Sequence, residues 1–144
     1  MLKASVIIPS YDRQMITLET LGHLNDQTET KFEVIVVDQT EKKSKDLELF
    51  QFRNSSMGYK YVRIKEIGLP NARNIGVNYA SANLVIFIDD DCIPHPRICG
   101  GRTASHLQMR FATNFCANSL LLDLSRTLAA ATRPRRTRPP DRRH

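Results

Sequence analysis

Apolar runs that end in polar residues recur along the first 91 residues of the chain. The run from Leu84 to Ile88 leads directly into three carboxylates, Asp89, Asp90 and Asp91. Five consecutive apolar residues predict a strand that is buried on both faces, as in a parallel sheet, with its acids at the carboxyl edge. Because open α/β sheets bind ligands at this edge, the pattern predicts both a fold class and the place of its site.

Strand-like and helix-like segments alternate through this part of the chain, which predicts an α/β fold with a parallel sheet and right-handed crossovers. Strands are expected at residues 3–9, 32–37, 59–65 and 84–88, and helices at residues 14–26, 42–52 and 70–80. Apolar and basic residues alternate over residues 59–65, which favours a half-exposed strand near the edge of the sheet.

The helix that begins at Pro70 has one apolar face, which we expect to pack on the sheet. That face consists of Ala72, Ile75, Gly76, Tyr79 and Ala80. Arg73 lies off this face in the first turn, near the helix N-terminus, where an anion is favoured. Its guanidinium suits phosphate oxygens, although a solvated arginine would give the same pattern.

Polar residues follow three of the predicted strands, at residues 9–13, 38–40 and 89–91. Since parallel strands end at one edge of a sheet, these groups are expected to line one cleft. In an extended chain Asp89 and Asp91 point to one side and Asp90 to the other. Their oxygens favour Mg²⁺ or Mn²⁺, and a nucleoside diphosphate with its metal would fit. The alternatives are a solvated acidic turn at these residues and, for Asp38, a cap on the following turn.

The net charge of +6 is divided unequally along the chain. Residues 1–96 hold 11 Lys and Arg against 13 Asp and Glu, whereas residues 97–144 hold 10 Arg, no Lys and 2 Asp. The second segment shows no sustained strand or helix period, and its end is rich in Arg and Pro, so we expect disorder or weak helix there. We therefore divide the chain at residue 96 into a folded half-domain and an atypical tail.

Other features weigh against several classes of protein. Neither GxGxxG nor GxxxxGK[ST] occurs, which argues against a dinucleotide-binding Rossmann unit and a P-loop NTPase. No apolar run approaches the roughly 20 residues that span a bilayer, so we expect no transmembrane segment and a cytoplasmic location. Cys92, Cys99 and Cys116 show no CxxC pair and no zinc-ligand spacing, and free thiols in a reducing compartment are expected.

Four blocks of sequence together resemble the N-terminal half of a family 2 glycosyltransferase of the GT-A fold. The blocks are residues 5–13, 33–38, 68–76 and 80–91, in the order and at the spacing of that family. The resemblance spans about residues 3–96. It implies a partial GT-A, Rossmann-like parallel sheet flanked by helices, which binds a nucleotide sugar and transfers the sugar to an acceptor hydroxyl.

The resemblance also implies roles for particular residues. The nucleotide would be bound by Pro9, Tyr11, Asp38, Arg73, Asp89 and Asp90, and Mg²⁺ or Mn²⁺ by Asp91 and Asp89. The metal would neutralise the leaving nucleoside diphosphate. The donor implied is a nucleotide sugar of the UDP type, while a sugar, a polysaccharide and a lipid-linked acceptor all stay open. Relatives often carry a second acid where this chain has Gln39, so the side chain that reads the base is also left open.

The tail departs from the family's pattern. Relatives have a further segment that supplies the acceptor site and a carboxylate general base. Asp123 and Asp141 are the only acids after residue 96, and neither lies in a recognisable context. A coding sequence read out of frame from near residue 97 would explain this composition, so we expect a donor-binding half without its general base.

Two other functions stay open from the sequence. A non-catalytic module would bind a nucleoside diphosphate and metal without sugar transfer. The arginines of residues 133–143 would bind nucleic-acid backbones non-specifically, but no aromatic residue interleaves them, so no specific nucleic-acid partner is expected. By resemblance alone, the expected setting is assembly of cell-envelope polysaccharide, with a peripheral position at the inner face of the membrane as an option.

Overall fold

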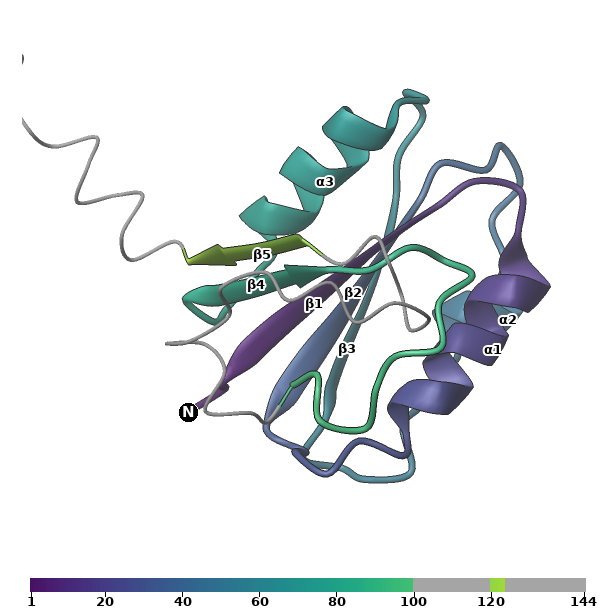
Figure 1. Ribbon diagram of the computed structural model, residues 1–144. Coiled ribbons are helices and arrows are strands. Elements are labelled where there is room, and N and C mark those ends of the chain that lie inside the picture. Colours follow the sequence, from purple (N-terminus) through teal and green to yellow (C-terminus); the bar gives the residue numbers. More distant parts are fainter. Residues whose placement is uncertain (100–119, 124–144) are drawn as a thin grey trace, which may run out of the picture.

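The described part of the chain folds around one mixed sheet (Figure 1). The structure is a computed structural model that describes residues 1–99 and the backbone of residues 120–123. The strands are β1 (Ala4–Ser10), β2 (Phe32–Asp38), β3 (Gly58–Arg63), β4 (Leu84–Phe87) and β5 (Leu120–Asp123). Their order is β3-β2-β1-β4-β5, with the first four parallel and β5 antiparallel to β4.

Helices cover both faces of this sheet (Figure 1). They are α1 (Gln14–Leu24), α2 (Lys45–Glu48) and α3 (Leu69–Asn78). Side chains of α1 and α2 pack into one apolar cluster with one face of the strands, and α3 packs into a second cluster on the other face. The predicted α/β fold, with a parallel sheet flanked by helices, is confirmed. Among the described residues, no helix is long and apolar enough to cross a membrane.

The helix expected over residues 42–52 is much shorter, because α2 comprises only four residues. Phe50 and Phe52 follow it in irregular backbone and join an aromatic cluster with Phe32 and Tyr59. The ring centroids of Phe50 and Phe52 lie 5.0 Å apart in an edge-to-face arrangement. Packing of two aromatic rings two residues apart into one cluster is incompatible with one helical face, so tertiary packing outweighs helix propensity here.

Strand β5 corrects the expectation for the tail, where disorder or weak helix was predicted. Its backbone pairs with β4 in antiparallel register, with Leu121 opposite Ile86. A run of three apolar residues is too short to show a period, and the pairing of this strand depends on the hydrogen-bonding edge that β4 offers. The other expectations for residues 97–144, including an out-of-frame origin, lie outside the described residues except for Arg97, Ile98 and Cys99.

Helix α3 approaches β1 closely through a glycine. Ala72 and Gly76 are buried against the sheet, as predicted. A Cβ atom built on Gly76 would lie 2.5 Å from Cγ2 of Ile7 in β1, so only glycine allows this approach. Tyr79, also expected on the buried face, is 48% exposed because the helix ends at Asn78.

The buried carboxylate of Glu33, at the amino edge of the sheet, binds the segment that follows the C-terminal end of α3. Glu33 of β2 is 2% exposed and accepts hydrogen bonds from Ser5 Oγ at 2.7 Å and from the backbone N–H and hydroxyl of Ser81. Lys60 of β3 forms an ion pair with it at 2.8 Å. Burial alone raises the pKa of Glu33, but the hydrogen bonds from Lys60, Ser5 and Ser81 outweigh burial and leave the pKa below its ordinary value.

Two cysteines fall within the described residues. Cys99 is a free thiol whose burial raises its pKa to about 12. Cys92 is disulfide-bonded, so the expectation of free thiols is wrong for this residue. Sequence spacing does not show which sulfur atoms a fold brings together, which is why the pairing was not predicted.

Substituting Gly76→Ala should lower the free energy of unfolding by about 1–3 kcal/mol, since the new methyl group overlaps a buried, β-branched side chain. Gly22→Ala in α1 is the matched control, because its Cβ would meet no atom within 4 Å. The control should be neutral or raise stability by up to about 1 kcal/mol. Urea unfolding measures both, and equal effects would contradict the close packing of α3 on β1.

The Glu33 network should make stability depend on pH. Its pKa in the folded state lies below the ordinary value of 4.5, so its contribution is present above pH 4.5 and is lost as the pH falls through the folded-state pKa. Glu33→Gln should therefore cost about 1–3 kcal/mol at pH 7, and this cost should shrink below pH 4.5. Urea unfolding from pH 7 to pH 3 tests this, and a cost that stays constant would contradict it.

Candidate functional site

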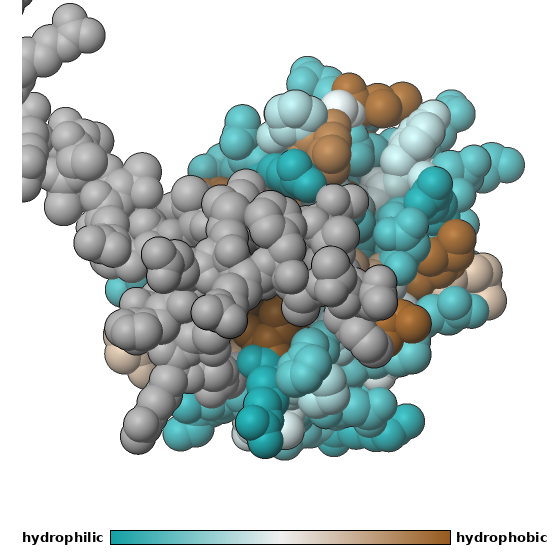
Figure 2. Space-filling model, in the orientation of Figure 1, coloured by the Kyte–Doolittle hydropathy of each residue, from teal (hydrophilic) through white to brown (hydrophobic). Residues whose placement is uncertain are grey.

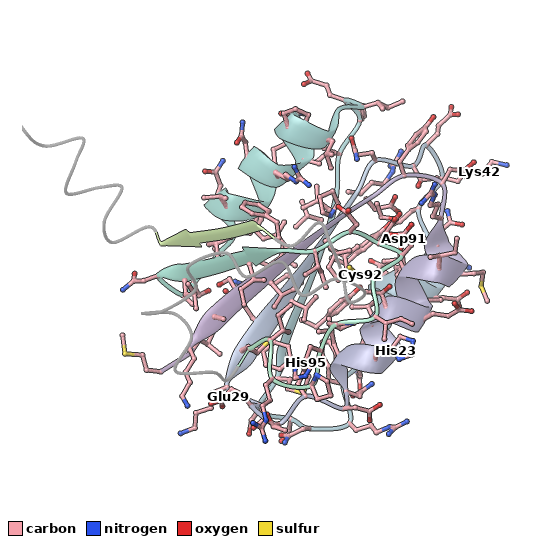
Figure 3. The ribbon with its side chains drawn as sticks, viewed as in Figure 1. His23, Glu29, Lys42, Asp91, Cys92 and His95 are labelled. Atoms are coloured by element: carbon pink, nitrogen blue, oxygen red, sulfur yellow. The ribbon has the colours of Figure 1, made fainter. Side chains whose placement is uncertain are left out.

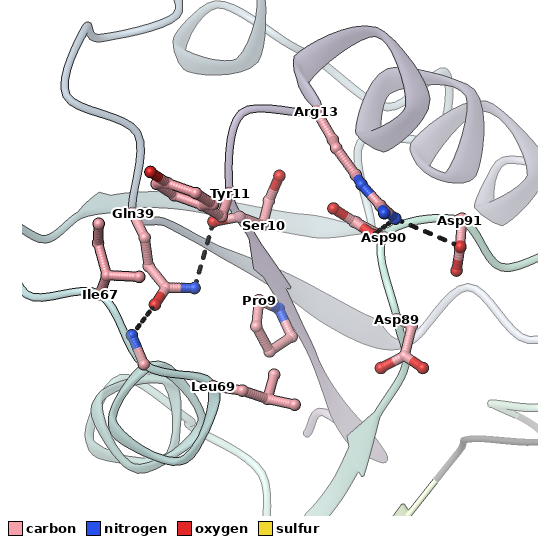
Figure 4. A pocket seen from close by; sticks show the side chains of 11 residues that line it. Pro9, Ser10, Tyr11, Arg13, Gln39, Ile67, Leu69, Asp89, Asp90 and Asp91 are labelled. Atoms are coloured by element: carbon pink, nitrogen blue, oxygen red, sulfur yellow. Dashed lines mark hydrogen bonds and ion pairs between the residues drawn. The ribbon is translucent and has the colours of Figure 1, made fainter.

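A cleft of about 450 Å³ opens at the carboxyl edge of the sheet, between the ends of β1 and β4 and the start of α3 (Figure 4). It is lined by Pro9, Ser10, Tyr11, Arg13, Gln39, Ile67, Gly68, Leu69, Asp89, Asp90 and Asp91. Its volume lies within the range of roughly 300–1,000 Å³ that is usual for small-molecule sites. The cleft therefore lies at the edge that the sequence predicted.

The two ends of the cleft differ in chemistry (Figure 4). Tyr11, Ile67 and Leu69 lie at one end and are 50%, 66% and 45% exposed. The acids of residues 89–91 and the guanidinium of Arg13 lie at the other end. Exposed apolar and aromatic side chains suit a flat ring, whereas carboxylates suit a cation, so the cleft fits a ligand with one apolar and one charged end.

The loop after β1 presents Tyr11 and Arg13 to opposite ends of the cleft. Between them, Asp12 has a φ of 53°, in the left-handed region that Asp tolerates better than most residues. Its backbone N–H donates to Oγ1 of Thr40 at 2.9 Å, which ties this loop to the loop after β2. The left-handed backbone at Asp12 and this hydrogen bond together fix the backbone positions of Tyr11 and Arg13.

Gln39 joins the two sides of the cleft. Its Oε1 accepts from the backbone N–H of Gly68 at 2.6 Å, and its Nε2 donates to the carbonyl of Ser10 at 3.4 Å (Figure 4). An amide can both donate and accept, whereas a carboxylate at this place could only accept. Gln39 is 6% exposed, so it fixes the start of α3 against the end of β1.

Two of the three acidic residues lie in a turn rather than in an extended segment. Strand β4 ends at Phe87, and Asp90 and Asp91 lie in a turn. From α1, the hydroxyl of Thr20 donates to the backbone carbonyl of Asp90 at 2.7 Å. Helix α1 thus holds the backbone of the turn in place, while the side chains of Asp90 and Asp91 line the cleft.

Each acid has an arginine partner. Nη1 of Arg13 lies 3.5 Å from Oδ1 of Asp90 and 3.4 Å from Oδ2 of Asp91. Asp89 lies instead beside Arg73, with 3.5 Å between Oδ1 and Nη2. The extended geometry expected for the three acids does not continue past the strand, and the observed partners divide them into Asp89 on one side and the pair Asp90–Asp91 on the other.

The Asp90 carboxylate is held in an environment that disfavours its charge. The residue is 8% exposed. Burial raises the pKa of Asp90 and the neighbouring Asp91 carboxylate adds to the rise, while Arg13 opposes it; the net shift is upward. A cation beside Asp90 would therefore be stabilising, and Arg13 supplies that charge in part.

Arg73 lies behind the cleft, in the second turn of α3 rather than in the first turn as expected. Its guanidinium carbon lies 5.8 Å from the centre of the Phe87 ring. Its Nε is buried and has no hydrogen-bond partner. The Nε–H group of Arg73, whose guanidinium lies beside Asp89, is therefore a hydrogen-bond donor without an acceptor.

Asp38 is also outside the lining of the cleft. It is fully buried; its Oδ1 accepts from the backbone N–H of Thr40 at 2.9 Å and its Oδ2 from the hydroxyl of Tyr61 at 2.7 Å. The first bond is the turn cap that was the alternative for this residue. Burial raises the pKa of Tyr61 to about 12, and the bond to Asp38 adds to the rise. Asp38 thus supports the loop that carries Gln39.

The structure brings together most of the residues expected at the site. Pro9, Tyr11, Asp89, Asp90 and Asp91 line the cleft, whereas Asp38 and Arg73 lie behind it. The lining residues not singled out were Ser10, Arg13, Ile67, Gly68 and Leu69. Four of these, Ser10, Arg13, Gly68 and Leu69, lie inside the sequence blocks quoted above, so the blocks themselves were the available signal. Nothing in the sequence pattern marked Ile67.

A divalent cation fits the acidic end by its chemistry. The position of the Arg13 nitrogen, within 3.5 Å of both Asp90 and Asp91, is one from which a cation would reach two carboxylates. Among the described residues, no three His, Cys, Asp or Glu side chains gather closely enough to hold a metal alone. Mg²⁺ is commonly bound by one or two carboxylates together with water and substrate phosphates. His95 and Glu29 lie toward the opposite edge from Asp91 (Figure 3).

The comparisons with known proteins agree with this fold and cleft. The sequence pattern of the family described as "Glycosyl transferase family 2" matches residues 5–118. The chain therefore belongs to glycosyl transferase family 2. The match continues to residue 118, past residue 96, where the resemblance was expected to end.

Among curated relatives, the chondroitin synthase of Escherichia coli is 38% identical over 95 residues, which cover 64% of this chain and 14% of that protein. Among solved structures, residues 1–349 of TarS from S. aureus are 28% identical with a TM-score of 0.58, covering 67% of this chain and 29% of that one. TarS has also been solved with UDP and with UDP-GlcNAc.

A third similarity concerns the fold alone. The mannosyltransferase PcManGT from Pyrobaculum calidifontis, solved with GDP-Man and Mn²⁺, is 22% identical with a TM-score of 0.57, covering 66% of this chain and 29% of that one. The chain spans between 10% and 31% of the length of the first curated relatives that it matches.

Tyr61→Phe should lower the free energy of unfolding by about 1–3 kcal/mol, because it leaves a buried oxygen of Asp38 without its donor. Tyr79→Phe is the matched control, since that residue is 48% exposed, and it should change stability by less than about 0.5 kcal/mol. Urea unfolding measures both variants. If Tyr61→Phe were as stable as the control, the hydrogen bond from Tyr61 to Asp38 would not contribute to stability.

Proposed function

We propose that this chain binds a nucleotide-sugar donor in the cleft and takes part in transferring its sugar to an acceptor hydroxyl, with Mg²⁺ or Mn²⁺ as cofactor. The observation that carries the proposal is the division of the cleft into an apolar end and an acidic end. A nucleoside diphosphate has the same division, with a flat base at one end and a charged diphosphate at the other. Membership in the glycosyltransferase family supports this choice of ligand.

The donor we propose is of the UDP type. The solved relative TarS binds UDP and UDP-GlcNAc, and its identity to this chain is 26–27% in those complexes. Similarity to a chondroitin synthase favours a sugar or polysaccharide acceptor. The setting we propose is assembly of a cell-envelope polysaccharide, which the similarity to a chondroitin synthase supports.

The residues of the cleft divide the work of binding. Tyr11 and Pro9 would contact the base, and Asp89 the ribose. Asp91 would hold the cation, as the family resemblance implies. The family resemblance implies Asp89 as the second carboxylate that binds the cation. The Arg13 guanidinium, however, lies beside both Asp90 and Asp91, so we propose that these two residues bind the cation.

Residues behind the cleft would support those that line it. Arg73 has an unpaired, buried Nε and a guanidinium at Asp89, and we propose that it donates to the diphosphate from its present position. Asp38 would hold the base-binding loop in place through Thr40. When bound, the cation would supply neutralisation of the charge that develops on the leaving diphosphate.

Binding of UDP should depend on the metal and on Asp91. Calorimetric titration of UDP, with and without Mn²⁺, should show binding only with the cation, and Asp91→Asn should weaken it at least about tenfold by removing a charged ligand. Asp26→Asn is the matched control, because Asp26 is exposed and lies beyond the end of α1, at the amino edge of the sheet. ADP serves as the second nucleotide.

Three outcomes separate the possibilities. Metal-dependent binding that Asp91→Asn loses and Asp26→Asn retains would support a donor site. No binding of either nucleotide by the folded chain would contradict it. Binding of UDP-GlcNAc with no release of UDP, in the presence of candidate acceptors, would favour a module that binds without transfer.

A further inference from the structure

Arg13 uses only part of its hydrogen-bonding capacity. Its Nη1 lies between the carboxylates of Asp90 and Asp91 at 3.5 and 3.4 Å, and within the described residues neither Nε nor Nη2 has a partner. An arginine presents five donors in a planar fork that matches paired oxygens. The two contacts through Nη1 are long and therefore weak, and the other donors belong to a side chain that lines the cleft.

The charges at the acidic end do not suit a diphosphate as they stand. Three carboxylates and two guanidiniums, those of Arg13 and Arg73, leave a net charge of −1 at this end. The diphosphate of a nucleotide sugar carries two negative charges and would be repelled. A divalent cation reverses the sign of the site, so cation and diphosphate should bind together rather than independently.

We propose that Arg13 exchanges partners when the donor binds. In the free protein its guanidinium holds Asp90 and Asp91 together. When the cation binds, Asp90 and Asp91 would hold it, and the released Arg13 guanidinium would donate to the oxygens of the diphosphate. This inference rests on the proposed function and adds a binding residue to it.

The two arginines differ in their freedom to make such an exchange. The Arg13 side chain is 53% exposed, and its backbone is anchored separately, because its carbonyl accepts from the N–H and the hydroxyl of Thr17. The Arg73 side chain is 28% exposed and lies near the Phe87 ring. Arg13 can therefore move its guanidinium without disturbing α1, whereas Arg73 is held by packing.

Arg13→Met separates this role from a structural one. The variant keeps the apolar stem and removes the charge that competes with the cation, so Mn²⁺ alone should bind about three to ten times more tightly. It also removes a donor to the diphosphate, so UDP at saturating Mn²⁺ should bind about ten times more weakly. Mn²⁺ binding is read by electron paramagnetic resonance and UDP binding by calorimetry.

The opposite signs of the two effects make the test specific. A variant that was merely misfolded would lose affinity for both ligands, and circular dichroism checks its fold. Arg13→Lys keeps the charge but presents no fork, so it should bind Mn²⁺ alone as the unmodified chain does and lose less UDP affinity than Arg13→Met. Arg53→Met is the matched control, since it removes one charge at the amino edge of the sheet and should change neither affinity.

The failure of this inference is distinguishable from that of the proposed function. If the unmodified chain binds UDP with Mn²⁺ and Arg13→Met changes neither affinity, or lowers both, the exchange is overturned and the donor site stands. If the unmodified chain binds Mn²⁺ but no UDP, the proposed function is overturned and the inference with it.

Discussion

The parallel pairing of β1 with a strand on each side is the constraint on which the site depends. Ile7 of β1 lies opposite Ile35 of β2 on one side and Phe87 of β4 on the other. Because these strands run in the same direction, three loops distant in sequence leave the sheet at one edge. A tight contact between Gly76 and Ile7 brings α3 onto the same strand, and Gln39 then fixes the start of α3 against the end of β1. The cleft follows from this arrangement.

Charge compensation allows three acids to lie side by side at that edge. The interaction of two carboxylates a few ångströms apart is unfavourable, and burial of Asp90 makes it more so. Arg13, paired with Asp90 and Asp91, and Arg73, paired with Asp89 from behind the cleft, reduce this cost. Contacts of 3.4–3.5 Å between partly exposed groups are weak, which suits a site whose charged partners have to change when a ligand arrives.

The sequence predicted the parts of the fold that are governed by local pattern and failed where distant contacts decide. Buried apolar runs predicted β1, β2 and β4, and alternation predicted the edge position of β3. The length of α2 could not be predicted, since it depends on packing of Phe50 and Phe52 against rings from two strands. Strand β5 depends on the free edge of β4, which has no local signal.

At the site, too, the features that depend on contacts between residues distant in sequence could not be predicted. Sequence blocks placed Tyr11 and the three acids at one edge, but the direction in which Asp38 points is set by Tyr61, 23 residues away. The partner of each acid depends on where the chain turns after Phe87, and hydrophobic pattern does not record that turn. The roles of Arg13 and Gln39 follow from contacts across the cleft and so appeared only in three dimensions.

The most direct test of a metal-dependent nucleotide site at the carboxyl edge is nuclear magnetic resonance of the ¹⁵N-labelled chain with UDP, comparing Mg²⁺ with paramagnetic Mn²⁺. If the cation and diphosphate bind in the cleft, Mn²⁺ will broaden the amide signals of Tyr11, Arg13, Gln39 and Asp91 while those of Glu33 and Arg53 at the opposite edge stay sharp. Broadening centred away from these four residues, or none at saturating UDP and Mn²⁺, would contradict the assignment of the site.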